Sequence, residues 1–168
     1  MNKIVPDKFQ EKADITYEHL FRAIYRPVVN LAKELEQTLG REKAFKIVKD
    51  ASEKSSIEMV KRQVEERPFR SFDEFKEYWK ELLKTPFWTH TSTLAIEEDK
   101  PDRFKFHVTE CLWAKTFEEL GAPEIGYLMC CQPDYATARV YHPKICMKRT
   151  KTLMQGDKYC DPAYVWKE

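Results

Sequence analysis

The spacing of apolar residues changes once along this chain of 168 residues, close to Pro86, and that change most constrains the fold. Upstream of Pro86, apolar side chains recur every three or four residues, which is the period of an amphipathic helix. Downstream, apolar and polar side chains alternate, which is the period of a half-buried strand. The sequence therefore predicts a helical N-terminal half that is followed by a sheet.

Two long helices are predicted over 14–39 and 41–66, followed by a short one that opens at Ser71 with the spacing of a capping box. Gly40 is placed to end the first helix, and Pro27 should kink or split it because proline lacks an N–H. The first helix carries one apolar stripe, which consists of Tyr17, Leu20, Phe21, Ile24, Val28, Ala32, Leu35 and Leu39.

Four strands are predicted, over 87–97, 102–109, 145–153 and 160–166. Short helices are expected between the two pairs, over 110–120, 123–131 and 134–141, and Thr109 can cap the first of them. This order indicates an α+β fold, with helices packed on a roughly four-stranded antiparallel sheet. We expect one domain over 1–168, with a helical layer in 1–86 and the sheet with its inserted helices in 87–168.

Charge and hydropathy exclude several classes of protein. Lys and Arg number 29 against 28 Asp and Glu, so the net charge of +1 gives no reason to expect nucleic-acid binding. No apolar run is long enough to cross a membrane, and the N-terminus lacks the apolar core of a signal peptide, so we expect a cytoplasmic protein without a membrane partner. Its five cysteines then indicate free thiols, a metal site or catalysis rather than disulfides.

All five cysteines follow residue 110, so any thiol chemistry lies in the last third of the chain. Cys111 falls at a predicted strand-to-helix junction, where a helix N-terminus would stabilise a thiolate; a small buried hydrophobe is the alternative. Cys130 and Cys131 are adjacent, so only one should face a given pocket, and Cys131 is the better candidate. Cys160 follows a Gly-Asp turn, whereas Cys146 is expected in the core.

Charged residues of the same region also have two interpretations. Asp134 is either a helix N-cap or a general base, or it pairs with a cationic amidine. Arg149 either forms a surface ion pair or holds a substrate carboxylate with both of its terminal nitrogens. Cys111, Cys131, Cys160 and a histidine could together bind zinc, but no Cys-x-x-Cys pair supports this, so no cofactor is expected.

Three runs, 110–113, 131–135 and 149–161, resemble the L-2-amino-thiazoline-4-carboxylic acid hydrolase family. The resemblance covers most of the chain and is specific in its C-terminal half. It implies a hydrolase in which water, or a thiolate first, adds to the carbon between the ring sulfur and ring nitrogen of a cyclic isothiourea. The carbon–sulfur bond then breaks and leaves an N-carbamoyl cysteine. The residues implied are Cys111, Cys131, Asp134 and Cys160 for catalysis, with Arg149, Trp113, Tyr135 and Asp161 for substrate binding.

The ending 156–160 is also similar to the terminal motif of 4-vinyl reductase domains, which are relatives of TRAPP subunits. That similarity implies the same layout of helices over a four-stranded antiparallel sheet. Zinc-binding members have an acidic residue and a cysteine where Arg149 and Thr152 stand here, which argues against a structural zinc. The alternative function is then a non-catalytic small-molecule-binding or dimeric assembly module. A small-molecule substrate is the expected partner, and a homodimer is left open.

Overall fold

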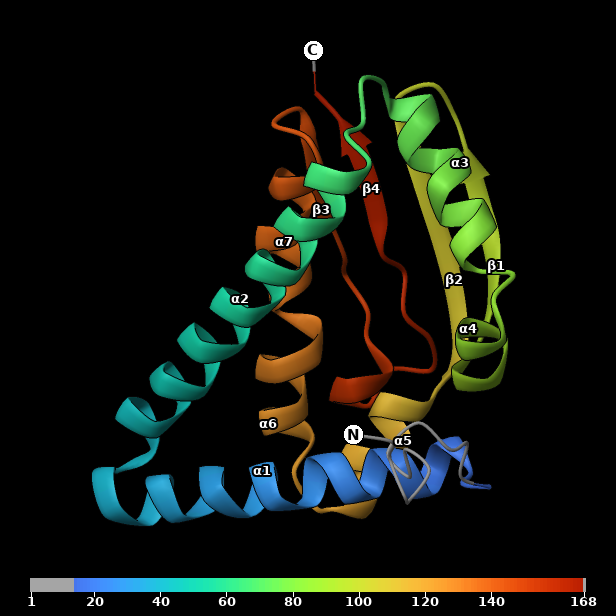
Figure 1. Ribbon diagram of the computed structural model, residues 1–168. Helices are drawn as coiled ribbons and strands as arrows, with labels where there is room; N and C mark the ends of the chain where they lie inside the picture. The colour runs from blue at the N-terminus through green and yellow to red at the C-terminus, as the bar shows by residue number, and fades with distance from the viewer. Residues whose placement is uncertain (1–13, 168) are drawn as a thin grey trace, which may run out of the picture.

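The computed structural model describes residues 14–167 and has an α+β fold with one sheet (Figure 1). The four strands lie in the order β1-β2-β4-β3, and each neighbouring pair is antiparallel. Their bounds are β1 Ser92–Asp99, β2 Arg103–Cys111, β3 Ile145–Lys148 and β4 Ala163–Trp166. The predicted class, helices on a four-stranded antiparallel sheet, is confirmed.

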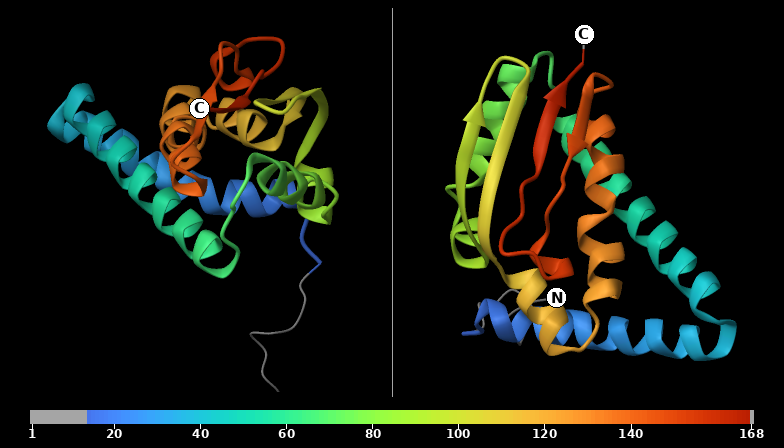
Figure 2. Two further views of the ribbon diagram at one scale, coloured as in Figure 1. Left: turned by 90° about the horizontal axis from the view of Figure 1, so that it is seen from above. Right: turned by 180° about the vertical axis from the view of Figure 1, so that it is seen from behind.

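The helices lie on one face of the sheet and leave the other face uncovered (Figure 2). α3 (Phe72–Leu82) covers β1 and β2, and α7 (Pro133–Tyr141) lies beside β3. α2 (Arg41–Glu66) has the predicted bounds and runs along α7. α1 (Tyr17–Leu39) instead lies across one end of the molecule, where it packs on α5 (Leu112–Glu119). No helix within 14–167 has the length and hydropathy needed to span a membrane.

Two separate hydrophobic cores explain this arrangement of the long helices. The first core joins α2 and α3 to the sheet and α7, through residues that include Val60, Phe75 and Phe104. The second core joins α1 to α5 and the segments after it, through Val29 and Phe117 among others. Of the two long helices, α2 therefore packs in the core that includes the sheet. α1 instead stabilises the end of the molecule where β2 is followed by α5.

α1 continues as one helix through Pro27, so the predicted split at this residue is wrong. Pro27 is exposed, and the loss of one backbone hydrogen bond is offset because Phe21, Val29 and Ala32 hold the opposite face of the helix in place. Gly40 ends α1 as predicted. Its φ of 80° suits glycine, and α2 begins at the next residue.

Residues 86–91 also differ from the prediction, because they form the short helix α4 (Pro86–Thr91) and not the start of β1. Pro86 occupies the first helical position, where its missing N–H has no intrahelical partner to lose. The hydroxyl of Thr91 donates to the carbonyl of Phe87 at 2.8 Å, which satisfies a polar group inside the helix. The alternation of residue types in 87–91 was therefore a misleading signal.

The last two strands are shorter than predicted because carboxylates take the backbone N–H groups that a longer sheet would use. Asp161 accepts from the N–H groups of Thr150 at 2.8 Å and Lys151 at 2.7 Å. Asp157 accepts from the N–H of Thr152 at 2.8 Å. The segment after β3 accordingly leaves the sheet and forms the 3₁₀ turn η3 (Leu153–Gln155).

Candidate functional site

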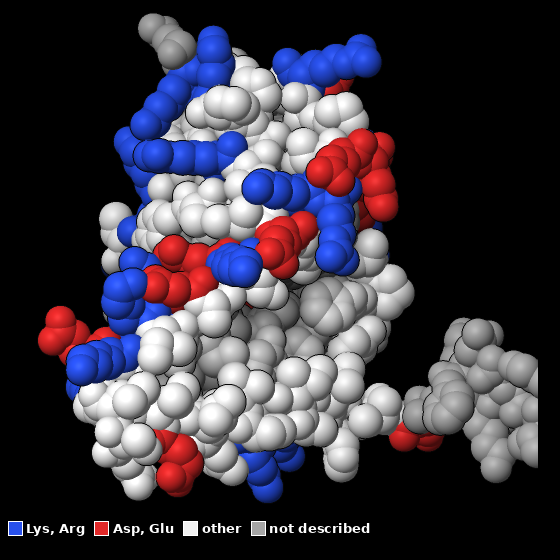
Figure 3. Space-filling view, turned by 60° about the vertical axis from the view of Figure 1, so that its left-hand side comes forward, with Lys and Arg blue, Asp and Glu red and all other residues white. Residues whose placement is uncertain are grey.

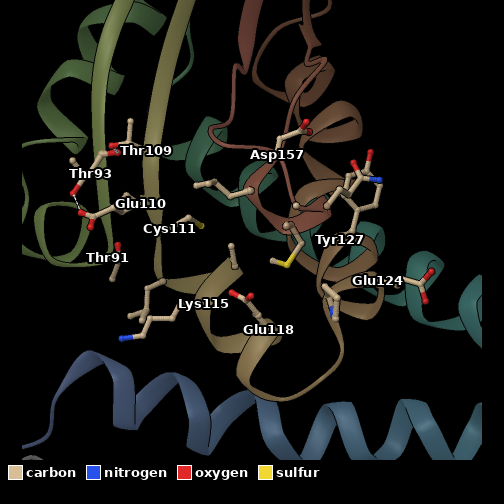
Figure 4. Close-up of a pocket in the computed structure, with 18 of the residues that line it drawn as sticks. Thr91, Thr93, Thr109, Glu110, Cys111, Lys115, Glu118, Glu124, Tyr127 and Asp157 are labelled. Carbon is tan, nitrogen blue, oxygen red and sulfur yellow. Dashed lines mark hydrogen bonds between the residues drawn. The ribbon is translucent and has the colours of Figure 1, made fainter.

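A cavity of about 1220 Å³ opens at the end of the sheet nearest α1. Its walls come from the junction of α4 with β1, the end of β2, α5, the first turn of α2, and η3 with the residues after it (Figure 4). These segments are far apart in the sequence. The cavity exists because the second core brings α5 and η3 together below the sheet.

Cys111 lies in the wall of this cavity, at the junction that the sequence predicted. It is the last residue of β2 and the N-cap of α5, so the predicted capping role of Thr109 is wrong. Ala114, Lys115 and Glu118 follow Cys111 at helical spacings of three, four and seven residues, and all of them line the cavity. In Figure 4 the Cys111 side chain points into the cavity, and the Glu118 carboxylate points toward the same space from α5.

Hydroxyl groups form the side of the cavity next to the sheet. Thr91, Thr93 and Thr109 lie there together with Glu110. The hydroxyl of Thr93 donates to the Glu110 carboxylate, and that of Thr109 donates to the Thr93 carbonyl at 3.4 Å. This side can therefore exchange hydrogen bonds with a polar ligand, and its carboxylate is already held in place.

Acidic groups outnumber basic ones around the cavity. Both lining cations are paired: Arg41 with Glu124 at 2.5 Å, and Lys115 with Glu18 of α1. Asp157 is held by the backbone of Thr152. The carboxylate of Glu118 makes no hydrogen bond or ion pair with any residue in the described part of the chain, so it is available to a cationic ligand.

Burial raises the pKa of the Cys111 thiol above its ordinary value. The backbone N–H groups of Ala114 and Trp113, at the start of α5, oppose this shift because they stabilise the thiolate. Desolvation is the larger effect. The helix N-terminus was predicted to lower this pKa, and the net direction is the reverse.

Cys131 and Cys160 lie behind the cavity wall, on either side of Thr152. The hydroxyl of Thr152 is 3.9 Å from the Cys131 sulfur and 3.7 Å from the Cys160 sulfur. Burial raises the pKa of Cys131 to about 12. Cys130 points elsewhere, into a groove between α1 and α2, because the π-helical turn η2 (Tyr127–Cys131) separates the two adjacent side chains. Only Cys130 of the pair lines this groove and neither lines the larger cavity, whereas the sequence analysis favoured Cys131 as the residue that faces a pocket.

Arg149 is fixed inside the protein. Its guanidinium donates to the Asp134 carboxylate at 3.0 Å and to the Cys131 carbonyl at 2.5 Å, and it lies over the ring of Tyr135 at 5.3 Å. Surrounding protein raises the pKa of Asp134 to about 6, although Arg149 opposes the shift. The Nε of Arg149 is buried without a partner among the described residues.

Of the eight predicted site residues, only Cys111 lines the cavity. Trp113 packs on α1, where its indole N–H donates to Tyr25 at 3.0 Å, and Asp161 holds the backbone after β3. Within 14–167, no three His, Cys, Asp or Glu side chains are placed to hold a metal ion. The sequence analysis missed Lys115 and Glu118, which the helical period counted from Cys111 would have placed on the same face.

The fold and the cavity define an α+β protein with a polar cavity and a cysteine at a helix N-terminus in its wall. The chain belongs to the L-2-amino-thiazoline-4-carboxylic acid hydrolase family, whose sequence model matches residues 17–164. The predicted resemblance to this family is thereby confirmed, and the match covers most of the chain.

No curated protein matched the sequence. Among solved structures, the phenol-responsive sensory domain of the transcription activator PoxR, determined with phenol, matches with a TM-score of 0.49 and 14% identity. The match covers 84% of this chain and 73% of that chain, and at this level of similarity it adds nothing to the assignment.

Proposed function

We propose that the protein hydrolyses a small cyclic amidine-type substrate, such as an aminothiazoline carboxylate, in the cavity beside Cys111. The observation that carries the proposal is the position of Cys111, which combines a cavity wall, a helix N-terminus and a carboxylate on the same helix face. Membership of a hydrolase family supports it. Cys131, Asp134, Cys160 and Arg149, predicted to act with Cys111, lie outside this cavity wall, so we assign the direct contacts to other residues.

The reaction proceeds in two steps. The Cys111 thiolate adds to the carbon between the ring sulfur and ring nitrogen, and the ring carbon–sulfur bond breaks; the ring sulfur leaves as a thiolate and takes up the proton that Cys111 released. Water then adds to the same carbon and Cys111 leaves. The oxygen of the water becomes the carbamoyl oxygen of the product, and Cys111 recovers a proton.

Charge in the cavity fits this substrate. The Glu118 carboxylate is suited to pair with the amidinium group. Lys115 could bind the substrate carboxylate only by giving up its ion pair with Glu18. A cationic amidinium beside Cys111 would favour the thiolate, because an opposite charge stabilises the charged form. Substrate binding would thus oppose the effect of burial on the Cys111 pKa and activate the nucleophile.

Non-catalytic binding of a small molecule in the same cavity is the second candidate. The observation that favours it is the burial of Cys111, which keeps the thiol protonated when the cavity is empty. A binding protein would hold the aminothiazoline carboxylate without opening its ring.

Product formation separates the two candidates. We expect the protein to convert aminothiazoline carboxylate to N-carbamoyl cysteine, detected by mass spectrometry, and Cys111→Ala to lower turnover by about 10³-fold or more. The matched control is Cys146→Ala on β3, which should retain activity because Cys146 does not line the cavity. Binding without product in the parent protein would favour the second candidate. Equal turnover by the parent and Cys111→Ala would rule out the thiol mechanism.

A further inference from the structure

α1 carries a second apolar stripe on the side away from the second core. Its residues Ile24, Val28, Leu31, Leu35 and Leu39 are spaced by four, three, four and four, which is close to the seam of two packed helices. Leu31 is 61% exposed. The sequence analysis placed Ile24, Val28, Leu35 and Leu39 in one stripe with Phe21 and Ala32, but the residues buried in α1 are Phe21, Val29 and Ala32. This face of α1 is therefore apolar and has no partner among the described residues.

A groove of about 420 Å³ runs next to this stripe, between α1 and the first half of α2. Small residues of α2, Ala51, Ser52 and Ser55, form one side of it, and Ile47 stands exposed at its edge. The groove reaches inward to Cys130. In Figure 3 the corresponding lower part of the surface is hollowed and is almost free of charged side chains.

Exposed apolar residues are concentrated here. Nine large hydrophobic side chains are exposed in the described part of the chain, and five of them, Ile24, Val28, Leu31, Leu39 and Ile47, belong to this one face. Such a cluster on a protein surface marks an interaction site, since isolated exposed hydrophobics would be scattered.

We propose that this face of α1 and α2 is the interface of a two-fold homodimer. Three residues of the stripe, Val28, Leu31 and Leu35, also line the groove, so stripe and groove form one continuous apolar face. A two-fold axis through this face would pack it on the same face of the second copy, which is what a self-complementary interface requires. None of the described groove-lining residues is charged, although charged residues make up 34% of the chain. Near a two-fold axis a charge meets its own copy, so a neutral centre suits a second copy better than a charged partner.

The size of the apolar patch and the net charge of the chain are both compatible with a second copy of the chain as the partner. The stripe from Ile24 to Leu39 is about 22 Å long at the rise of an α-helix. With the adjoining face of α2, the patch covers roughly 500 Å² on each copy, so the dimer would bury about 1,000 Å², close to the lower limit for a stable interface. The net charge of +1 gives little repulsion between two copies.

Analytical ultracentrifugation of the full chain tests the proposal. We expect a dimer at about 10 μM, and we expect Leu31→Asp and Val28→Asp to weaken it by at least about 100-fold while the circular dichroism spectrum is retained. The matched control is Ile96→Asp on β1, which also places a charge at an exposed hydrophobic position but lies outside the patch. The proposal would be overturned if the parent protein were a monomer, if the Leu31→Asp variant remained a dimer, or if Ile96→Asp weakened the dimer as much as Leu31→Asp does.

Two further measurements keep the test decisive if the charged variants fail to fold. Leu31→Ala is milder and should still weaken the dimer by about 10-fold, and an unchanged dissociation constant would overturn the proposal. Alkylation mapped at Cys130 should be faster in a monomeric variant than in the parent, because the dimer covers the groove in which Cys130 lies. Equal alkylation of Cys130 in a dimeric parent and a monomeric variant would place the interface elsewhere and overturn the proposal.

Discussion

Cys111 combines exposure to a cavity with a thiol that resists ionisation. Burial raises its pKa, and the backbone N–H groups of Ala114 and Trp113 offset only part of that effect. In the ligand-free protein we therefore expect iodoacetamide to alkylate Cys111 more slowly than a free cysteine near pH 7. Because the thiolate is the reactive form, the rate should still be rising when the pH exceeds the ordinary pKa of a cysteine. Peptide mapping after timed alkylation measures this rate at each pH. A rate that levels off near neutral pH would contradict the raised pKa of Cys111.

Single residues also show where the sequence was sufficient and where it was not. The place of Cys111 at a strand-to-helix junction was predictable because both flanking periods are visible in the sequence. The pairing of Arg149 with Asp134 was not predictable, because the two residues are 15 positions apart. The sequence alone does not indicate which of the many acidic residues an arginine will pair with. Glu118 could have been found, because it follows Cys111 by two helical turns.

Among the helices and turns, α6 (Pro123–Gly126) approaches α5 so closely that only glycine fits at position 126. A Cβ there would lie 2.5 Å from the Cγ of Phe117 and 2.7 Å from the sulfur of Met154. We expect Gly126→Ala to lower the free energy of unfolding by up to about 2 kcal/mol, because overpacking costs ~1–3 kcal/mol and the gain in helix propensity returns only ~1 kcal/mol. Urea unfolding followed by circular dichroism measures the change.

Combining this substitution with Phe117→Ala provides the control. The alanine removes the Cγ, which is the atom nearest to the new Cβ, so the double variant should be more stable than the sum of the two single effects predicts. Strictly additive effects would mean that the contact with Phe117 is not the source of the cost.

The boundaries of elements followed the sequence where local signals were strong. α2 has its predicted bounds because Gly40 and Pro68 flank a segment that contains no other glycine or proline. The shortened β3 and β4 could not be predicted, because the carboxylates of Asp157 and Asp161 compete for the backbone through bonds that only the folded chain brings together. α4 was missed because Trp88 and His90 alternate with Thr89 and Thr91, which resembles the alternation of a strand.

At the scale of the whole molecule, the two hydrophobic cores stabilise different parts of the fold. The larger one fixes the sheet under α2, α3 and α7, while the smaller one holds α1 against α5 and the segments that follow it. The cavity lies at the end of the sheet beside the smaller core, which contributes Phe45, Ala114, Tyr127 and Met154 to its wall. The α+β class was predictable from the change of period near Pro86, but the existence of a second core was not, because one apolar stripe on α1 looks the same whether it meets a sheet or other helices.

The central claim is that the Cys111 thiol attacks the substrate, and a covalent adduct is its most direct test. Addition of the thiol and opening of the ring conserve all atoms, so acid-quenched protein should gain the full mass of one aminothiazoline carboxylate, mapped to the peptide that contains Cys111. Cys146→Ala should form the same adduct, and Cys111→Ala should form none. Turnover by Cys111→Ala, or an adduct that maps only to another cysteine, would contradict the claim.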